Sequence, residues 1–231
     1  MCGRMSLPHT AAEIMEVFEA SHWDAAPPLA PSYNVAPSQV AAVLRQENES
    51  QVLHPMHWGL IPRWAKSRSV GYKMINARIE TLTTKPAYRS LVQRKRCVAV
   101  AQGYYEWQKS PAGKTPFFIT SERAPLLCFA ALWDRWQHGE NAVSSFTIIT
   151  RPPAPKLAQI HNRMPALLTP QQHKRWLSPA EPPELLLAEL AQSASDDLQF
   201  YPVSNFVNRP ANNGPRCVEP AHQEPSLFDL H

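Results

Sequence analysis

Apolar residues recur along the chain mainly in short runs, which predicts strands more often than helices. Runs rich in valine, isoleucine, phenylalanine and other aromatic residues predict strands at 40–45, 51–58, 96–107, 116–120, 126–133, 144–150 and 198–203. Helical patterns are fewer and shorter. The pattern therefore favours an α+β fold, a single domain built on a mostly antiparallel, barrel-like β-sheet with flanking short helices.

Local signals predict where the helices begin. Thr10 and Glu13 form a capping-box pattern before an amphipathic stretch that ends near Phe18. Thr169 followed by Pro170 is a second helix start, because proline is favoured at the first helical position. Further helices are predicted at 85–94 and 182–192, a turn at 33–37 and an irregular loop at 59–75. We expect one domain over 1–208 and a flexible tail over 209–231.

Composition indicates an ordinary soluble globular protein, with 44% hydrophobic and 18% charged residues among 231. No apolar run approaches the ~18 residues of a membrane span, and the start lacks a signal-peptide core. We expect a cytoplasmic monomer with no membrane partner. The four cysteines show no CxxC spacing, which argues against a zinc site and a disulfide framework. Cys97 and Cys128 are predicted to be buried structural thiols, and no metal or cofactor is expected.

The net charge of +4 is unevenly distributed. Residues 51–120 hold 12 Lys/Arg and 2 Asp/Glu, a balance of +10, whereas the segments before and after it are both negative. Tryptophan and tyrosine residues lie among these positive charges. Cations interleaved with aromatics suit single-stranded nucleic acid, because cations bind phosphates and flat rings stack on bases. A generic solvated basic face is the alternative interpretation.

Cys2 can have unusual reactivity because of its position in the chain. A small residue at position 2 generally allows the initiator Met1 to be removed, which would place an α-amine and a thiol on one Cα. Their ordinary pKa values, about 8 and about 8.5, leave a reactive fraction of each near neutrality. Such a 1,2-aminothiol condenses with an aldehyde to an imine, which the thiol closes to a thiazolidine ring.

Polar islands interrupt the apolar pattern at five places. They read MCGR at 1–4, WGLIPRW at 58–64, NARIET at 76–81, GYYEW at 103–107 and IHNRMP at 160–165. Together with YNVAP at 33–37, FAALW at 129–133 and Val203-Ser204, they closely resemble the SRAP family of SOS response-associated peptidases, understood as abasic-site processing proteins. The resemblance extends from residue 1 to about 208.

The resemblance implies a covalent crosslink to the aldehyde of an abasic site in single-stranded DNA, made by the N-terminal cysteine as a thiazolidine. It implies the catalytic set Cys2, Asn76, Glu106 and His161. Glu106 would move protons at the amine, His161 would act as a general acid near neutrality, and Asn76 would hold the sugar oxygens. Predicted phosphate ligands are Arg4, Arg78 and Arg163. Predicted stacking or wedging residues are Pro37, Trp64 and Trp107.

The sequence departs from the family pattern at two points. Val100-Ala101-Gln102 stands where Pro-Ala-Asp is usual, which puts a charge role at position 102 in doubt. The loop 65–75 has its own length and composition, so DNA contacts there cannot be transferred. As to the family's name, the sequence supports peptidase activity only as removal of Met1, while strand cleavage by β-elimination would be a lyase activity.

Two other functions fit parts of the sequence. An amidohydrolase resembling class II glutamine amidotransferases would also begin Met-Cys-Gly and use its freed amine as a base. Only 7 glycines are present, however, and there is no room for a synthase domain. A non-covalent single-stranded DNA-binding module is the other alternative.

The C-terminus carries an apolar pair in a polar stretch, at Ser226-Leu227-Phe228. This core resembles the short peptide by which bacterial replication proteins bind the sliding clamp, with Gln223 as an anchor one residue too far upstream. A tail that folds back on the domain is the alternative.

Overall fold

A closed five-stranded barrel is the larger part of the structure. The computed structural model describes residues 2–23, 29–111, 113–192 and 197–221. The barrel strands are β10 (Asn141–Arg151), β4 (Ser50–Trp58), β3 (Val40–Glu47), β6 (Arg96–Ala101) and β9 (Leu127–His138). Each pairs with the next, and β9 pairs with β10 to close the ring; only β10–β4 is parallel. The predicted barrel-like, mostly antiparallel sheet is confirmed.

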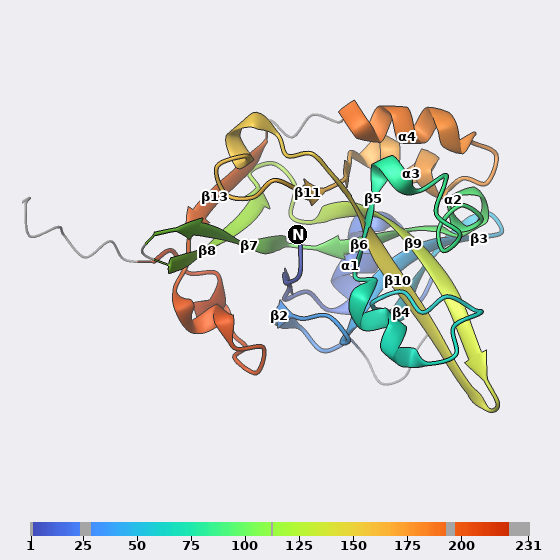
Figure 1. The fold of residues 1–231 in the computed structure, drawn as a ribbon, viewed down its shortest axis with the longest axis horizontal. Coiled ribbons are helices and arrows are strands. Elements are labelled where there is room, and N and C mark those ends of the chain that lie inside the picture. The colour runs from blue at the N-terminus through green and yellow to red at the C-terminus, as the bar shows by residue number, and fades with distance from the viewer. Residues whose placement is uncertain (1, 24–28, 112, 193–196, 222–231) are drawn as a thin grey trace, which may run out of the picture.

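A second, open sheet lies beside the barrel (Figure 1). Its order is β13 (Leu198–Pro202), β8 (Gly113–Ser121), β7 (Gly103–Ser110), β1 (Met5–Leu7) and β2 (Ser32–Val35). All its pairs are antiparallel. The first described residues of the chain lie where the two sheets meet (Figure 1), so the start of the sequence is held inside the fold.

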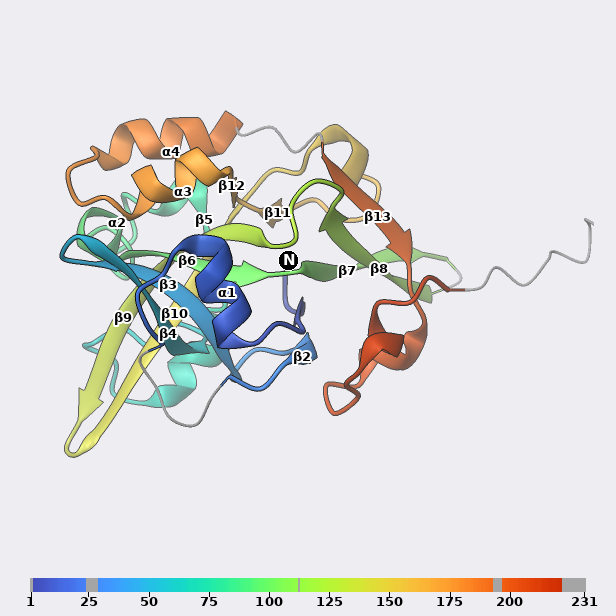
Figure 2. The same ribbon diagram turned by 180° about the vertical axis from the view of Figure 1, so that it is seen from behind.

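Short helices cover the barrel, as seen from behind in Figure 2. They are α1 (Ala11–Phe18), α2 (Leu91–Arg94), α3 (Pro170–Leu177) and α4 (Pro183–Gln192). The capping box of Thr10 with Glu13 is confirmed, and Thr169 forms another with Gln172. Among the described residues, no helix is long and apolar enough to cross a membrane.

Minor elements connect these units. The 3-10 turns are η1 (Arg68–Lys73), η2 (Ile79–Thr81), η3 (Pro155–Leu157), η4 (Asn205–Asn208) and η5 (Pro215–Cys217). Short strands are β5 (Asn76–Arg78), which pairs parallel with β10, β11 (Met164–Pro165) and β12 (Leu167–Leu168). The loop predicted at 59–75 contains η1. The backbone of Gly71 in η1 packs closely on Gly59: a Cβ added to Gly59 would lie 2.6 Å from the Gly71 carbonyl oxygen.

The predicted strand 96–107 is two strands in different sheets. β6 closes part of the barrel and β7 belongs to the open sheet, with Gln102 at the junction. Gln102 is held by a backbone bond to the Ser6 oxygen (2.8 Å) and by Thr120, whose hydroxyl donates to its carbonyl (2.7 Å). A Cβ at Gly103 would lie 2.4 Å from the Phe118 ring. Periodicity could not reveal this break, because both halves are apolar.

Two large apolar clusters fill most of the described structure. One lies inside the barrel and extends to the junction of the sheets; it contains Cys97, Trp58, Phe129 and also Cys2. The other packs α1, α3 and α4 on the outside of the barrel and contains Cys128. Cys97 and Cys128 are free and buried, as predicted.

Three further sequence expectations need correction. Residues 33–37 are not simply a turn, because 32–35 pair with β1 as β2. The helix at 85–94 is reduced to α2, preceded by turns. The tail predicted to be flexible from 209 is packed as far as 221: Cys217 is fully buried and Val203 bridges Pro220. The clamp-like segment 226–228 lies outside the described residues.

His173 on α3 is buried with neither ring nitrogen hydrogen-bonded within the described structure, and its ring contacts that of Phe18. Burial, with a smaller effect of Lys174, lowers its pKa below the ordinary 6.5. Since the unfolded state then binds more protons, this site loses stability as the pH falls through 6.5. We expect His173→Leu to stabilise the fold by about 1 kcal/mol at pH 7.5, and by more at pH 5.5. Denaturant unfolding at both pH values measures it; equal stability would contradict it.

Candidate functional site

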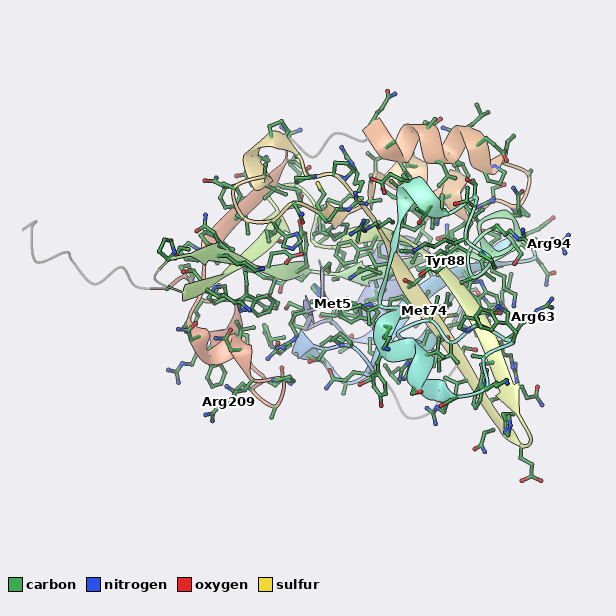
Figure 3. All side chains as sticks on the ribbon, viewed as in Figure 1. Met5, Arg63, Met74, Tyr88, Arg94 and Arg209 are labelled. Carbon is green, nitrogen blue, oxygen red and sulfur yellow. The ribbon has the colours of Figure 1, made fainter. Side chains whose placement is uncertain are left out.

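The N-terminal segment enters the site as an added strand. β1 lies between β2 and β7, with Met5 opposite Tyr104, and the Arg4 carbonyl accepts a hydrogen bond from Tyr105 N–H (3.0 Å). Antiparallel pairing therefore carries the chain from Met5 back toward Cys2 alongside the part of β7 that bears Glu106. In Figure 3, Met5 lies near the middle of the molecule.

The side chain of Cys2 is fully buried. Burial raises the pKa of its thiol far above the ordinary value, and the nearby Glu106 carboxylate adds to that shift. The thiol is therefore protonated at neutral pH. Its sulfur becomes a good nucleophile only when a neighbouring base accepts the proton.

Asn76 fixes the backbone at Cys2. It is the first residue of β5, whose parallel pairing with β10 aims it at the junction of the sheets. Its amide Nδ2 donates a 2.6 Å hydrogen bond to the Cys2 carbonyl. Its Oδ1 is buried and has no hydrogen-bond partner among the described residues. A buried acceptor without a donor is costly, so Asn76 offers a ready contact for a hydroxyl or ammonium group beside Cys2.

Glu106 on β7 is 5% exposed. Burial raises the pKa of its carboxyl from 4.5 to about 7. A carboxyl that is half-protonated at neutral pH can both donate and accept a proton, which is what general acid–base catalysis requires. The sequence pointed to this residue, but its raised pKa depends on the residues that bury it in the fold.

His161 lies in the turn between η3 and β11 and is half-buried. Its Nδ1 lies 3.0 Å from the Arg163 backbone N–H and 3.2 Å from the Arg163 carbonyl. The shorter contact is to a group that can only donate, so Nδ1 accepts and Nε2 carries the proton. Burial is the main cause that lowers the pKa of His161, and Lys109 makes the smallest contribution. The ring is therefore mostly neutral at pH 7, and the general-acid role expected of His161 stays a prediction.

Arg163 holds this turn in place. Its guanidinium makes a bidentate ion pair with Glu80 on η2, at 2.6 and 3.0 Å, and also donates to the Thr150 carbonyl. Only 12% of its side chain is exposed. In this structure Arg163 thus binds a carboxylate, and its predicted phosphate contact remains a prediction. Glu80 positions Arg163, and through its backbone also His161.

A cleft of about 420 Å³ opens at these residues. It is lined by Glu106, Trp107, Lys109, Lys114, His161 and Asn208. Trp107 is oriented by its indole N–H, which donates to Asn208 Oδ1 at 2.8 Å. The structure thus brings Cys2, Asn76, Glu106 and His161 to one junction. Lys109, Lys114, Asn208 and Glu80 are the members that the sequence analysis missed.

The other predicted DNA-binding residues are distributed differently. Arg4 is buried and donates to Asn34 Oδ1 (2.7 Å) and the Val207 carbonyl (2.8 Å), which gives it a structural task. Arg78 on β5 is exposed and Pro37 half-buried. Trp64 is 62% exposed, as free surface for stacking requires. None of these DNA contacts is tested by the structure, and they stay predictions.

The basic block does not form one patch. Arg96 is buried and donates to the carbonyls of Trp176 (2.7 Å) and Val92 (2.9 Å), and Lys95 pairs with Asp134 (2.6 Å). Arg63 and Arg94 lie at the edge of the molecule away from Met5 (Figure 3). Only part of the +10 charge is therefore available to a ligand at the cleft. The described residues contain no cluster of three or more potential metal ligands.

Comparisons with known proteins show the family of the chain. The family model for the SOS response associated peptidase (SRAP) matches residues 1–210. The chain is 40% identical over 222 residues to the abasic site processing protein YoqW of Bacillus subtilis (strain 168), covering 95% of this chain and 99% of YoqW. It is 34% identical over 223 residues to the abasic site processing protein HMCES of Gallus gallus, covering 82% of this chain and 66% of HMCES.

A solved structure supports the fold in the same way. The crystal structure of a protein from Bacteroides thetaiotaomicron matches with a TM-score of 0.86 at 25% identity, over 96% of this chain and all of that one. The family match spans both sheets and includes each of the residues gathered at the cleft. The chain belongs to the SRAP family of abasic site processing proteins.

Proposed function

We propose that this protein crosslinks covalently to abasic sites in single-stranded DNA through Cys2, after Met1 has been removed. The observation that carries the proposal is the convergence of a buried Cys2, held by Asn76, with a carboxyl whose pKa is about 7, beside an open cleft. An aminothiol and a proton shuttle together are what an aldehyde needs to become a thiazolidine.

The reaction runs in three balanced steps. The free α-amine of Cys2 adds to the aldehyde carbon of the ring-opened sugar and gives a carbinolamine. Loss of one water gives an imine. The thiol sulfur then bonds to the imine carbon, the thiol proton leaves, and the former imine nitrogen gains a proton. The sum is aldehyde plus aminothiol going to thiazolidine plus water.

The residues divide this work by their ionisation. The amine attacks first, because burial keeps the thiol protonated. Glu106 supplies the proton that lets the carbinolamine lose water, and then, as a carboxylate, accepts the thiol proton. Neutral His161 donates a hydrogen bond from Nε2 to a sugar oxygen, and Asn76 Oδ1 accepts one. The same groups in reverse order would open the ring again.

The two alternatives differ in observable ways. An N-terminal-nucleophile amidohydrolase would release ammonia from glutamine and form no DNA adduct. A non-covalent module would bind single-stranded DNA but lose it on denaturation. Membership of the SRAP family supports the crosslinking proposal over both.

Intact mass tests the proposal. The purified protein should lack the mass of Met1, and after mixing with abasic single-stranded DNA it should gain the mass of the oligonucleotide minus one water. The same oligonucleotide with an undamaged base is the matched control and should add nothing. A protein with a free Cys2 that gains no mass would overturn the proposal.

Glu106→Gln tests the proton shuttle. We expect crosslinking to slow by about 10²–10⁴-fold, and the rate limb near pH 7 to disappear, since glutamine does not titrate. The variant should still fold. Because the pKa of Glu106 is raised in the folded state, ionisation of Glu106 lowers the stability of the wild-type protein as the pH rises from 4.5 to about 7. The glutamine variant should therefore be at least as stable as the wild type at pH 8. Single-turnover rates from pH 5.5 to 8.5 measure this. If the rate still changes near pH 7 in the variant, the group that titrates there is not Glu106, and the prediction is wrong.

A further inference from the structure

Two lysines face each other on the hairpin formed by β7 and β8. Lys109 lies directly opposite Lys114 in the ladder, and both are exposed. Directly opposed residues share a face of the sheet with Cβ atoms about 4.5–5.5 Å apart, where like charges destabilise the pair. Within the described residues, neither ammonium group forms a salt bridge or a hydrogen bond. No described residue therefore relieves the repulsion between them.

Both lysines line the cleft that contains Glu106 and His161. Lys109 lies close enough to His161 for its charge to make a small contribution to the lowered pKa of that ring. Trp107 lies two positions before Lys109 on the same strand, and residues two apart in a strand point to the same face. One face of the hairpin thus carries an aromatic ring followed by two cations, beginning beside the reacting groups.

Two other cations near the cleft are already engaged. Arg163 is paired with Glu80, and Arg4 is bound to Asn34 and the Val207 carbonyl. The lysine pair is the unpaired positive charge that lines this cleft among the described residues. Two adjacent ammonium groups fit a ligand that carries closely spaced negative charges and that need not present any particular base. A phosphodiester backbone is such a ligand.

We propose that Lys109 and Lys114 bind the phosphodiester backbone of the DNA strand where it leaves the abasic site, with Trp107 as the surface for the neighbouring base. This inference rests on the proposed function, because it identifies how the same cleft holds its substrate. A phosphate bound there relieves the repulsion between the lysines, so the pair costs stability in the free protein and contributes affinity in the complex.

The salt dependence of non-covalent binding tests this. With undamaged single-stranded DNA, Lys109→Gln combined with Lys114→Gln should flatten the slope of log affinity against log salt by about 0.7 per lysine, about 1.4 in total. Affinity at low salt should fall roughly ten-fold. Because the opposed charges are gone, the melting temperature of the free variant should be equal to or above that of the wild type.

Lys174→Gln is the matched control. Lys174 is exposed on α3 and pairs with Glu19 at 3.4 Å, outside the cleft, so its loss should leave the slope unchanged. An unchanged slope in the double variant overturns the inference, as does competition by inorganic phosphate as strong as that by the oligonucleotide, which would indicate a site for a free anion. Since this assay needs no aldehyde, it is independent of the proposed chemistry, whose failure would show instead as a wild-type protein without a covalent adduct.

Discussion

An N-terminal extension that retains Met1 is expected to abolish the covalent adduct with abasic DNA. An acylated nitrogen at Cys2 cannot form an imine. The addition of the α-amine to the aldehyde, the first step of the proposed reaction, is therefore blocked. Position also matters, because Cys2 is fully buried and its carbonyl is held by Asn76, which keeps the backbone nitrogen at a defined place at the junction of the sheets.

The measurement is the fraction of protein that carries DNA after denaturation, read by gel shift and intact mass. The matched control is the same extension placed after His231, far along the chain from the reacting groups, and this protein should crosslink like the wild type. An N-terminally extended protein of confirmed mass that still forms the adduct at the normal rate would show that the α-amine is not the nucleophile.

Cys2→Ala is expected to remove the stable adduct completely while leaving a weaker reaction behind. Alanine still permits removal of Met1, so the α-amine remains and can form the imine. Without sulfur there is no ring closure, and the imine either hydrolyses or promotes β-elimination that nicks the strand. Borohydride should therefore trap an adduct in the variant that denaturation alone does not preserve.

Cys128→Ala is the control for losing a buried thiol. Cys128 belongs to the cluster beneath the helices, so its loss should lower stability and leave the adduct in place. A denaturation-resistant adduct with Cys2→Ala, formed without borohydride, would mean that another group completes the bond and that the thiazolidine assignment is wrong.

Local patterns predicted the elements whose causes are local. The capping boxes at Thr10 and Thr169 depend on residues three positions apart, and both helices begin where those residues indicate. The apolar runs likewise predicted the barrel strands, because the pattern that defines a strand lies within a few consecutive residues. The division of 96–107 was not predictable, since it depends on Gly103 meeting Phe118 and on Gln102 bridging to Ser6 and Thr120. The ordered segment up to 221 likewise depends on a pocket for Cys217 that other strands supply.

By itself, the sequence determined the family, and it predicted the residues of the site: Cys2, Asn76, Glu106 and His161. The tertiary structure decided how those groups are charged and oriented. Burial by distant residues moves the Glu106 pKa to about 7, a backbone N–H sets the tautomer of His161, and Glu80 occupies Arg163. Residue identity is encoded position by position, whereas solvation and electrostatic environment are sums over neighbours that only folding brings together.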